Sequence, residues 1–83
     1  MPYSRVKMVY EVYKIIKDNN FKERQELAHF LMQDLEKYSE HLEFIMMNTI
    51  YFDSGSVQAM LDRLGKRLEG ANLIPQNPTK ETQ

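Results

Sequence analysis

The 83-residue chain contains no cysteine and no tryptophan, and only three glycines and three prolines. Without cysteine, a disulfide framework, a thiolate zinc site and a thiol nucleophile are all excluded. No proline stands between residues 3 and 74, and the first glycine is Gly55. Strands are normally separated by more turn residues than this, so the composition favours an all-α fold.

Long apolar runs are also missing. The longest stretch without a charged residue, 44–52, has nine residues, whereas a membrane helix needs roughly 20. The first residues lead into alternating charges and not into the apolar core of a signal peptide. The chain is 42% hydrophobic and 28% charged with a net charge of −1, which is typical of a soluble globular protein. We therefore expect a cytoplasmic protein with one small domain over 1–70 and a tail over 71–83, disordered beyond residue 78.

Two segments carry one clear apolar stripe each. In the segment 5–17 the stripe consists of four residues spaced 3, 4 and 3 apart: Val6, Val9, Tyr13 and Ile16. In the segment 56–69 the spacing is 4, 3 and 4: Val57, Leu61, Leu64 and Leu68. We expect a helix over each segment, a turn after the first because Asn19 and Asn20 tolerate left-handed backbone angles, and Gly70 just after the second.

The middle of the chain keeps an apolar side in helical phase from residue 27 to residue 52. From residue 35 its inner positions alternate by 3 and 4, which is the spacing of a heptad seam. They are Leu35, Tyr38, Leu42, Ile45, Thr49 and Phe52. We favour one continuous helix over 23–52; a break near Ser39 is the alternative. The fold is then a small bundle of three principal helices, with the first and third covering the two halves of the long one.

Sites for chemistry are scarce. Glu26 and His29 have the spacing used in di-metal bundles, but those bundles need a second such pair, and His29 falls opposite the apolar side. His41 falls at the edge of that side, where a packed or hydrogen-bonded role is expected. No nucleophile elbow or glycine-rich phosphate loop is present. We expect no metal, no cofactor and no enzymatic activity.

Charge is unevenly distributed along the chain. Residues 1–25 carry six basic and three acidic side chains (+3), residues 26–53 one basic and six acidic (−5), and residues 54–83 four basic and three acidic (+1). In one interpretation the basic first helix lies beside the acidic middle segment. In the other, the basic residues form a nucleic-acid surface. Those residues are Arg5, Lys7, Lys14, Lys17, Lys22 and Arg24.

The strip 44–52 is the most unusual stretch, since seven of its nine residues are large and apolar and lie around the whole helix. A helix that is apolar on all sides must be covered on all sides. We therefore predict a protein interface there. The predicted contact residues are Phe44, Met47, Ile50 and Tyr51. The alternatives are an internal core covered by the chain itself, and a β-strand.

Small size, a lack of catalytic groups and an apolar strip together favour a non-catalytic interaction module, such as an adaptor, an inhibitor or a regulatory subunit. We expect a homodimer, a protein partner docked on the strip, or both. A nucleic-acid-associated regulator is the alternative function.

Overall fold

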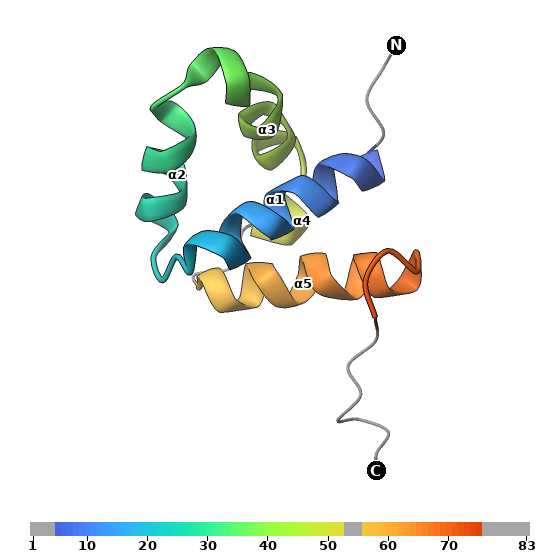
Figure 1. Ribbon diagram of the computed structural model, residues 1–83. Helices are drawn as coiled ribbons and strands as arrows, with labels where there is room; N and C mark the ends of the chain where they lie inside the picture. Colours follow the sequence, from blue (N-terminus) through green and yellow to red (C-terminus); the bar gives the residue numbers. More distant parts are fainter. Residues whose placement is uncertain (1–4, 53–55, 76–83) are drawn as a thin grey trace.

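The computed structural model describes residues 5–52 and 56–75, apart from the side chain of Thr49. It confirms the all-α fold, and every regular element in these ranges is a helix (Figure 1). The helices are α1 (Arg5–Asn19), α2 (Arg24–Met32), α3 (Leu35–Met47), α4 (Thr49–Phe52) and α5 (Val57–Gly70).

Helices α1 and α5 lie against each other and run in opposite directions, while α2 and α3 form an arch over one side of α1 (Figure 1). One core joins all five helices. Its most enclosed residues are Val9, Val12, Ile16, Leu31, Phe44, Met60, Leu64 and Leu68. Most of the predicted stripes of α1 and α5 contribute to this core, because their apolar residues recur on one side of each helix.

The ends of α1 and α5 are built alike. After α1, the Asn20 N–H bonds to the Lys17 carbonyl and the Phe21 N–H to the Ile16 carbonyl. Asn20 has φ 53°, which confirms the predicted turn. After α5, the residue with a left-handed backbone is Asn72, with φ 62°. The prediction that Gly70 would end this helix from the position just after it was therefore wrong. Gly70 is the last residue of α5.

The continuous helix over 23–52 was wrong. The chain breaks after Met32 and again at Asn48, and Ser39, the alternative position for a break, lies inside α3. At the first break the Asp34 side chain accepts a bond from the Lys37 N–H at 3.2 Å and thereby caps α3. At the second, the Asn48 amide donates to the Phe44 carbonyl at 2.9 Å. Each break is thus stabilised by a short polar side chain bonded to backbone.

These breaks also overturn the predicted seam. The buried residues of α3 are His41 and Phe44, while Leu35, the first seam residue, is 56% exposed. Leu42 and Ile45 are only half-buried. The break at Gln33 and Asp34 interrupts the regular 100° step between residues. A helical wheel that starts at Leu27 therefore does not identify the side of α3 that faces the core.

The packing differs accordingly from the expected arrangement along one long helix. Instead, α1 packs chiefly along α5, where a Cβ added to Gly65 would lie 3.4 Å from Cε1 of Tyr13. Beyond α5, Ile74 packs against the core, whereas Leu73 stays exposed. The predicted disorder beyond residue 78 lies outside the described residues. Among those that are described, no helix is long and apolar enough to cross a membrane.

Candidate protein-docking surface

Three large apolar residues between positions 46 and 50, at the end of α3 and in α4, face solvent. Met46 is 76% exposed, Met47 74% and Ile50 70%, the highest values among the large apolar residues in the described ranges. We call these three residues the Met face. Because exposing large apolar side chains has a free-energy cost in water, a group of them close together in the sequence is typical of a contact surface.

The predicted contact residues divide between this surface and the core. Met47 and Ile50 belong to the Met face, as expected for a surface that a partner would cover. Phe44 is 1% exposed and lies in the core, so its predicted place on the outer side was wrong. Tyr51 is half-buried, with its ring stacked on that of Phe44 at 6.2 Å between centroids. Phe44 and Tyr51 therefore support the Met face from within.

Part of the strip 44–52 is covered by its own chain. Phe52 is 3% exposed, and its ring meets that of Phe44 edge-on. The strip is helical, so the β-strand alternative is wrong, while the internal-core alternative is correct for Phe44 and Phe52. Within the strip, the large apolar residues that stay exposed are those of the Met face.

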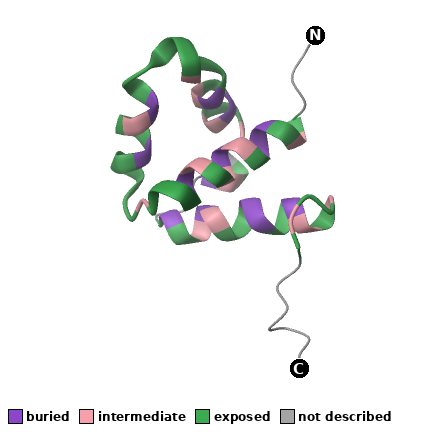
Figure 2. Ribbon diagram, viewed as in Figure 1, coloured by how far each residue is buried: buried purple, intermediate pink, exposed green. Residues whose placement is uncertain are grey.

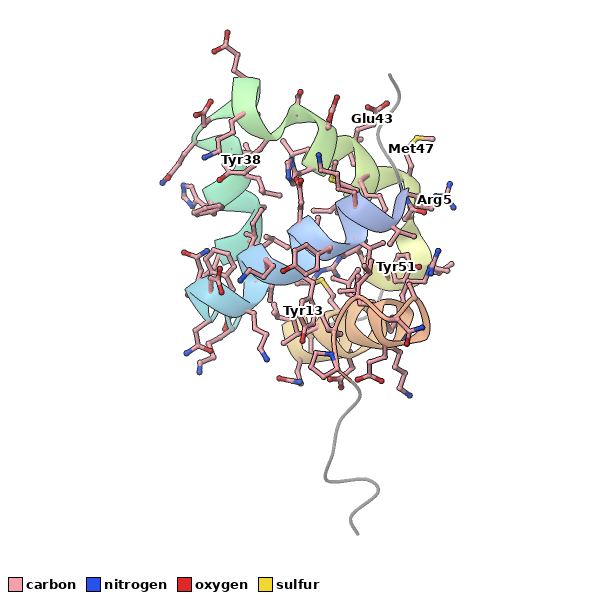
Figure 3. All side chains as sticks on the ribbon, turned by 45° about the vertical axis from the view of Figure 1, so that its right-hand side comes forward. Arg5, Tyr13, Tyr38, Glu43, Met47 and Tyr51 are labelled. Carbon is pink, nitrogen blue, oxygen red and sulfur yellow. The ribbon has the colours of Figure 1, made fainter. Side chains whose placement is uncertain are left out.

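The outer side of α3 is acidic as well as apolar. Glu36, Glu40 and Glu43 are all exposed, and we call them the acidic edge. At 100° per residue, Met47 lies within about 40° of each of them around the helix. Figure 3 shows Glu43 and Met47 projecting outward from the same side of α3. Figure 2 shows that exposed residues follow the outer side of the α2–α3 arch.

Among the described residues, the acidic edge has no counter-ion. In the ranges 5–52 and 56–75, no hydrogen bond or ion pair reaches the side chain of Glu36, Glu40 or Glu43. Lys37, the one basic residue of the segment 26–53, holds its ammonium 5.2 Å from the ring centroid of Tyr38. Like charges three and four residues apart repel each other along a helix. The outer side of α3 thus combines uncovered apolar surface with uncompensated negative charge.

Comparisons with protein-family models, curated proteins and solved structures found no match to this chain. The function must therefore be argued from the geometry.

The six basic residues of the nucleic-acid alternative are all exposed, but several have partners within the chain. Lys7 and Lys14 pair with Glu11 and Asp18, each four residues further along α1, at 3.8 and 3.6 Å. The Lys17 ammonium lies 5.7 Å from the centroid of the Tyr13 ring.

Two of the six residues lie outside α1 near its end, and one lies at its start. Arg24 donates from Nη2 to the Phe52 carbonyl at 2.6 Å, which joins the start of α2 to the end of α4. Lys22 precedes α2, and Arg5 opens α1 at the opposite end of that helix. These six positions are thus distributed over the length of α1 and the start of α2, and do not form one compact patch.

His41 is the most buried titratable side chain in the described ranges. Its Nε2 lies 2.8 Å from the Glu11 carboxylate, while Nδ1 is buried without a hydrogen-bond partner among the described residues. Its ring also meets Tyr38 edge-on at 5.1 Å. The expected packed, hydrogen-bonded role is confirmed. The interaction joins the Glu11 carboxylate of α1 to the imidazole of His41 on α3, and does not pair a basic residue of α1 with an acidic residue of α3.

Metal ligands do not converge in the described parts of the chain, where no group of three or more His, Asp or Glu side chains could hold an ion. His29 is exposed, as predicted. Glu26 instead accepts backbone N–H bonds from Lys22 at 2.7 Å and Glu23 at 3.1 Å, and these bonds lower the pKa of its carboxyl group. Glu26 therefore closes the first turn of α2.

A shallow groove of about 300 Å³ lies between α2, α3, α4 and α5. Leu27, Leu31, Leu42, Ile45 and Met60 are among its lining residues, and Arg24 and Gln25 are the polar ones. This groove accounts for the half-exposed state of Leu42 and Ile45. It suits an apolar side chain and offers no pair of acid and base groups.

Sequence reasoning missed Met46 as an exposed residue. Counted as part of a continuous helix, Met46 fell next to the predicted inner seam, and only the break before α3 places it outside. Asp34 was the available signal, because aspartate is among the preferred N-cap residues and here begins a new helix.

Proposed function

We propose that this protein is a small, non-catalytic interaction module of the cytoplasm that docks on another protein through the Met face. One observation carries the proposal: Met46, Met47 and Ile50 are each at least 70% exposed although they are large, apolar and close together in the sequence. Methionine suits such a surface because its side chain is flexible and polarisable. The homodimer predicted from the sequence is one form of the same function, with two Met faces covering each other.

The test compares the wild type with the triple variant Met46→Gln, Met47→Gln, Ile50→Gln. Because all three side chains are exposed, the variant should fold, which circular dichroism checks. We expect the wild type to show a concentration-dependent mass in light scattering, or to retain protein partners in affinity capture, and the triple variant to lose both properties.

Met32→Gln combined with Leu73→Gln serves as the matched control, since both residues are exposed and apolar but lie outside the Met face. The control should behave as the wild type. A wild type that is monomeric at all concentrations, and that captures the same proteins as the triple variant, would overturn the proposal.

The nucleic-acid alternative predicts a different result. Binding through Arg5, Lys7, Lys14, Lys17, Lys22 and Arg24 should weaken steeply with salt, because phosphate contacts release counter-ions. A mobility-shift titration with a DNA duplex and an RNA hairpin at low salt tests it, and the absence of a shift removes this alternative.

A further inference from the structure

The outer side of α3 has two features that suit the same kind of partner. The Met face offers apolar surface, and the acidic edge offers three carboxylates within about 40° of Met47 around the helix. From Glu36 to Met47 this surface extends over about 17 Å, or three helical turns. A surface of this shape matches an amphipathic helix laid alongside α3.

We propose that the Met face and the acidic edge form one docking surface for a cationic amphipathic helix of another protein. This inference rests on the proposed docking function and adds the chemistry of the partner. Apolar side chains of the partner cover Met46, Met47 and Ile50, while its lysines or arginines lie opposite Glu36, Glu40 and Glu43. The attraction fixes the orientation of the partner and speeds its association.

Charge complementarity is the reason to prefer a foreign cationic helix over a second copy. The segment 26–53 has a balance of −5, and none of the three carboxylates of the acidic edge has a counter-ion in the described parts of the chain. Mutual repulsion among these carboxylates destabilises α3 slightly. A cationic partner removes that repulsion when it binds.

In a second copy, the basic residues of α1 are less suitable counter-ions. On α1 the basic residues Lys7 and Lys14 already face acidic residues of their own helix, at 3.8 and 3.6 Å. A partner with unpaired cations fits better.

The acidic edge and the Met face follow each other along α3. Glu36 and Glu40 lie in its first two turns, whereas Met46 and Met47 lie in its last turn. The cations of the partner should accordingly be densest at the end that lies over the first two turns of α3.

The probe is a labelled amphipathic peptide of about 18 residues, five helical turns, with a leucine-rich side and with lysines concentrated toward one end. A second peptide with glutamate in place of every lysine is its control. Fluorescence anisotropy with the full-length protein gives the affinity at about 0.1 M and about 1 M salt, where the screening length falls from about 10 Å to about 3 Å. We expect the lysine peptide to bind, the glutamate peptide not to bind, and binding to weaken at the higher salt.

Three variants locate the contact. Glu36→Gln, Glu40→Gln, Glu43→Gln should weaken lysine-peptide binding about tenfold, since each exposed ion pair contributes up to about 1 kcal/mol and 1.4 kcal/mol is tenfold. Met46→Gln, Met47→Gln, Ile50→Gln should weaken it by at least about tenfold, because central apolar contacts dominate interface affinity.

The third variant is the matched control, which makes the same change in net charge on α1 and α5. It consists of Asp18→Asn, Asp62→Asn and Glu69→Gln. This control should change the affinity by less than about twofold, because screened charges away from the interface contribute little.

Each contrary result has a defined meaning. Equal weakening by the α1–α5 control, or equal binding of the glutamate peptide, would overturn the inference, since the attraction would not be specific to the acidic edge. If neither peptide binds but the protein self-associates through the Met face, the cationic partner is excluded while the docking function stands. If it also stays monomeric and its partner capture does not depend on the Met face, both proposals fail.

Discussion

Helices α5 and α3 are almost equal in length but are buried to different extents. Five of the 14 residues of α5 are buried, against two of the 13 residues of α3, although α3 contains more large apolar side chains. In α5 the apolar residues form one stripe that α1 covers, whereas in α3 they surround the helix and only one side meets the core. The arrangement of apolar residues, more than their number, decides how much of a helix is buried.

The largest expected effect separates two neighbours on α3. Phe44→Ala should lower the free energy of unfolding by about 4 kcal/mol, because it leaves a cavity beneath Tyr51 and Phe52. Met47→Ala, only three residues away, should change it by less than about 0.5 kcal/mol, since Met47 is 74% exposed. Urea unfolding measures both values. Equal costs would show that Met47 is covered in solution and would remove the contrast between the two sides of α3.

A smaller effect tests how α3 is attached to α1. Glu11→Ala removes the partner of His41 Nε2, and because Nδ1 already lacks one among the described residues, the ring becomes a buried polar group without hydrogen bonds. We expect a loss of about 1–2 kcal/mol. Asp18→Ala is the matched control on the same helix, since it breaks the exposed pair with Lys14 at a cost below about 1 kcal/mol. If Asp18→Ala lowers the free energy of unfolding as much as Glu11→Ala does, the contact between Glu11 and His41 stabilises the fold no more than an exposed ion pair.

The close packing of α1 on α5 can be tested by adding a methyl group at Gly65. Gly65→Ala places its Cβ 3.4 Å from Tyr13 Cε1, an ordinary contact, and removes a glycine from a helix interior. We expect a gain of about 0.5–1 kcal/mol. Gly70→Ala is the control, since no atom lies within 4 Å of its added Cβ. A net loss at position 65 alone would show that α1 and α5 approach more closely than this geometry allows.

The smallest effect concerns the start of α2. Backbone N–H bonds from Lys22 and Glu23 lower the pKa of Glu26 below its usual value of 4.5. A lowered pKa in the folded state stabilises the protein above the pKa of the unfolded chain, and this stabilisation is lost as the pH falls through the folded pKa. Glu26→Gln should therefore lower Tm at neutral pH, and the difference from wild type should shrink below pH 4.5. Thermal melts across this range check it; a difference independent of pH would contradict it.

The difference in apolar pattern between α5 and α3 also explains which helices could be predicted from the sequence. The bounds of α1 and α5 were predicted to within two residues, because each has a single stripe and a polar end signal: Asn20 after α1, and Ser56, which accepts a bond from the Ala59 N–H, before α5. Local spacing and local capping are both contained in a few adjacent residues.

The middle segment could not be predicted in this way. A helical wheel counts residues and is blind to a two-residue interruption, so the phase continued unchanged across Gln33 and Asp34. The actual orientation of α3 depends on where His41 finds Glu11 and where Phe44 meets Phe52, contacts between residues 30 and eight positions apart. Of the predicted contact residues, Met47 and Ile50 are therefore exposed and Phe44 is buried.

The bond from Arg24 to the Phe52 carbonyl joins two residues 28 positions apart in the chain. It closes the segment from α2 to α4 into a loop whose ends meet beside α5. With few buried residues between those ends, this loop should open as one cooperative unit while α1 and α5 remain paired. Amide hydrogen exchange would then divide the molecule into a slow-exchanging pair of helices and a faster-exchanging arch, and the arch is the part that carries the Met face.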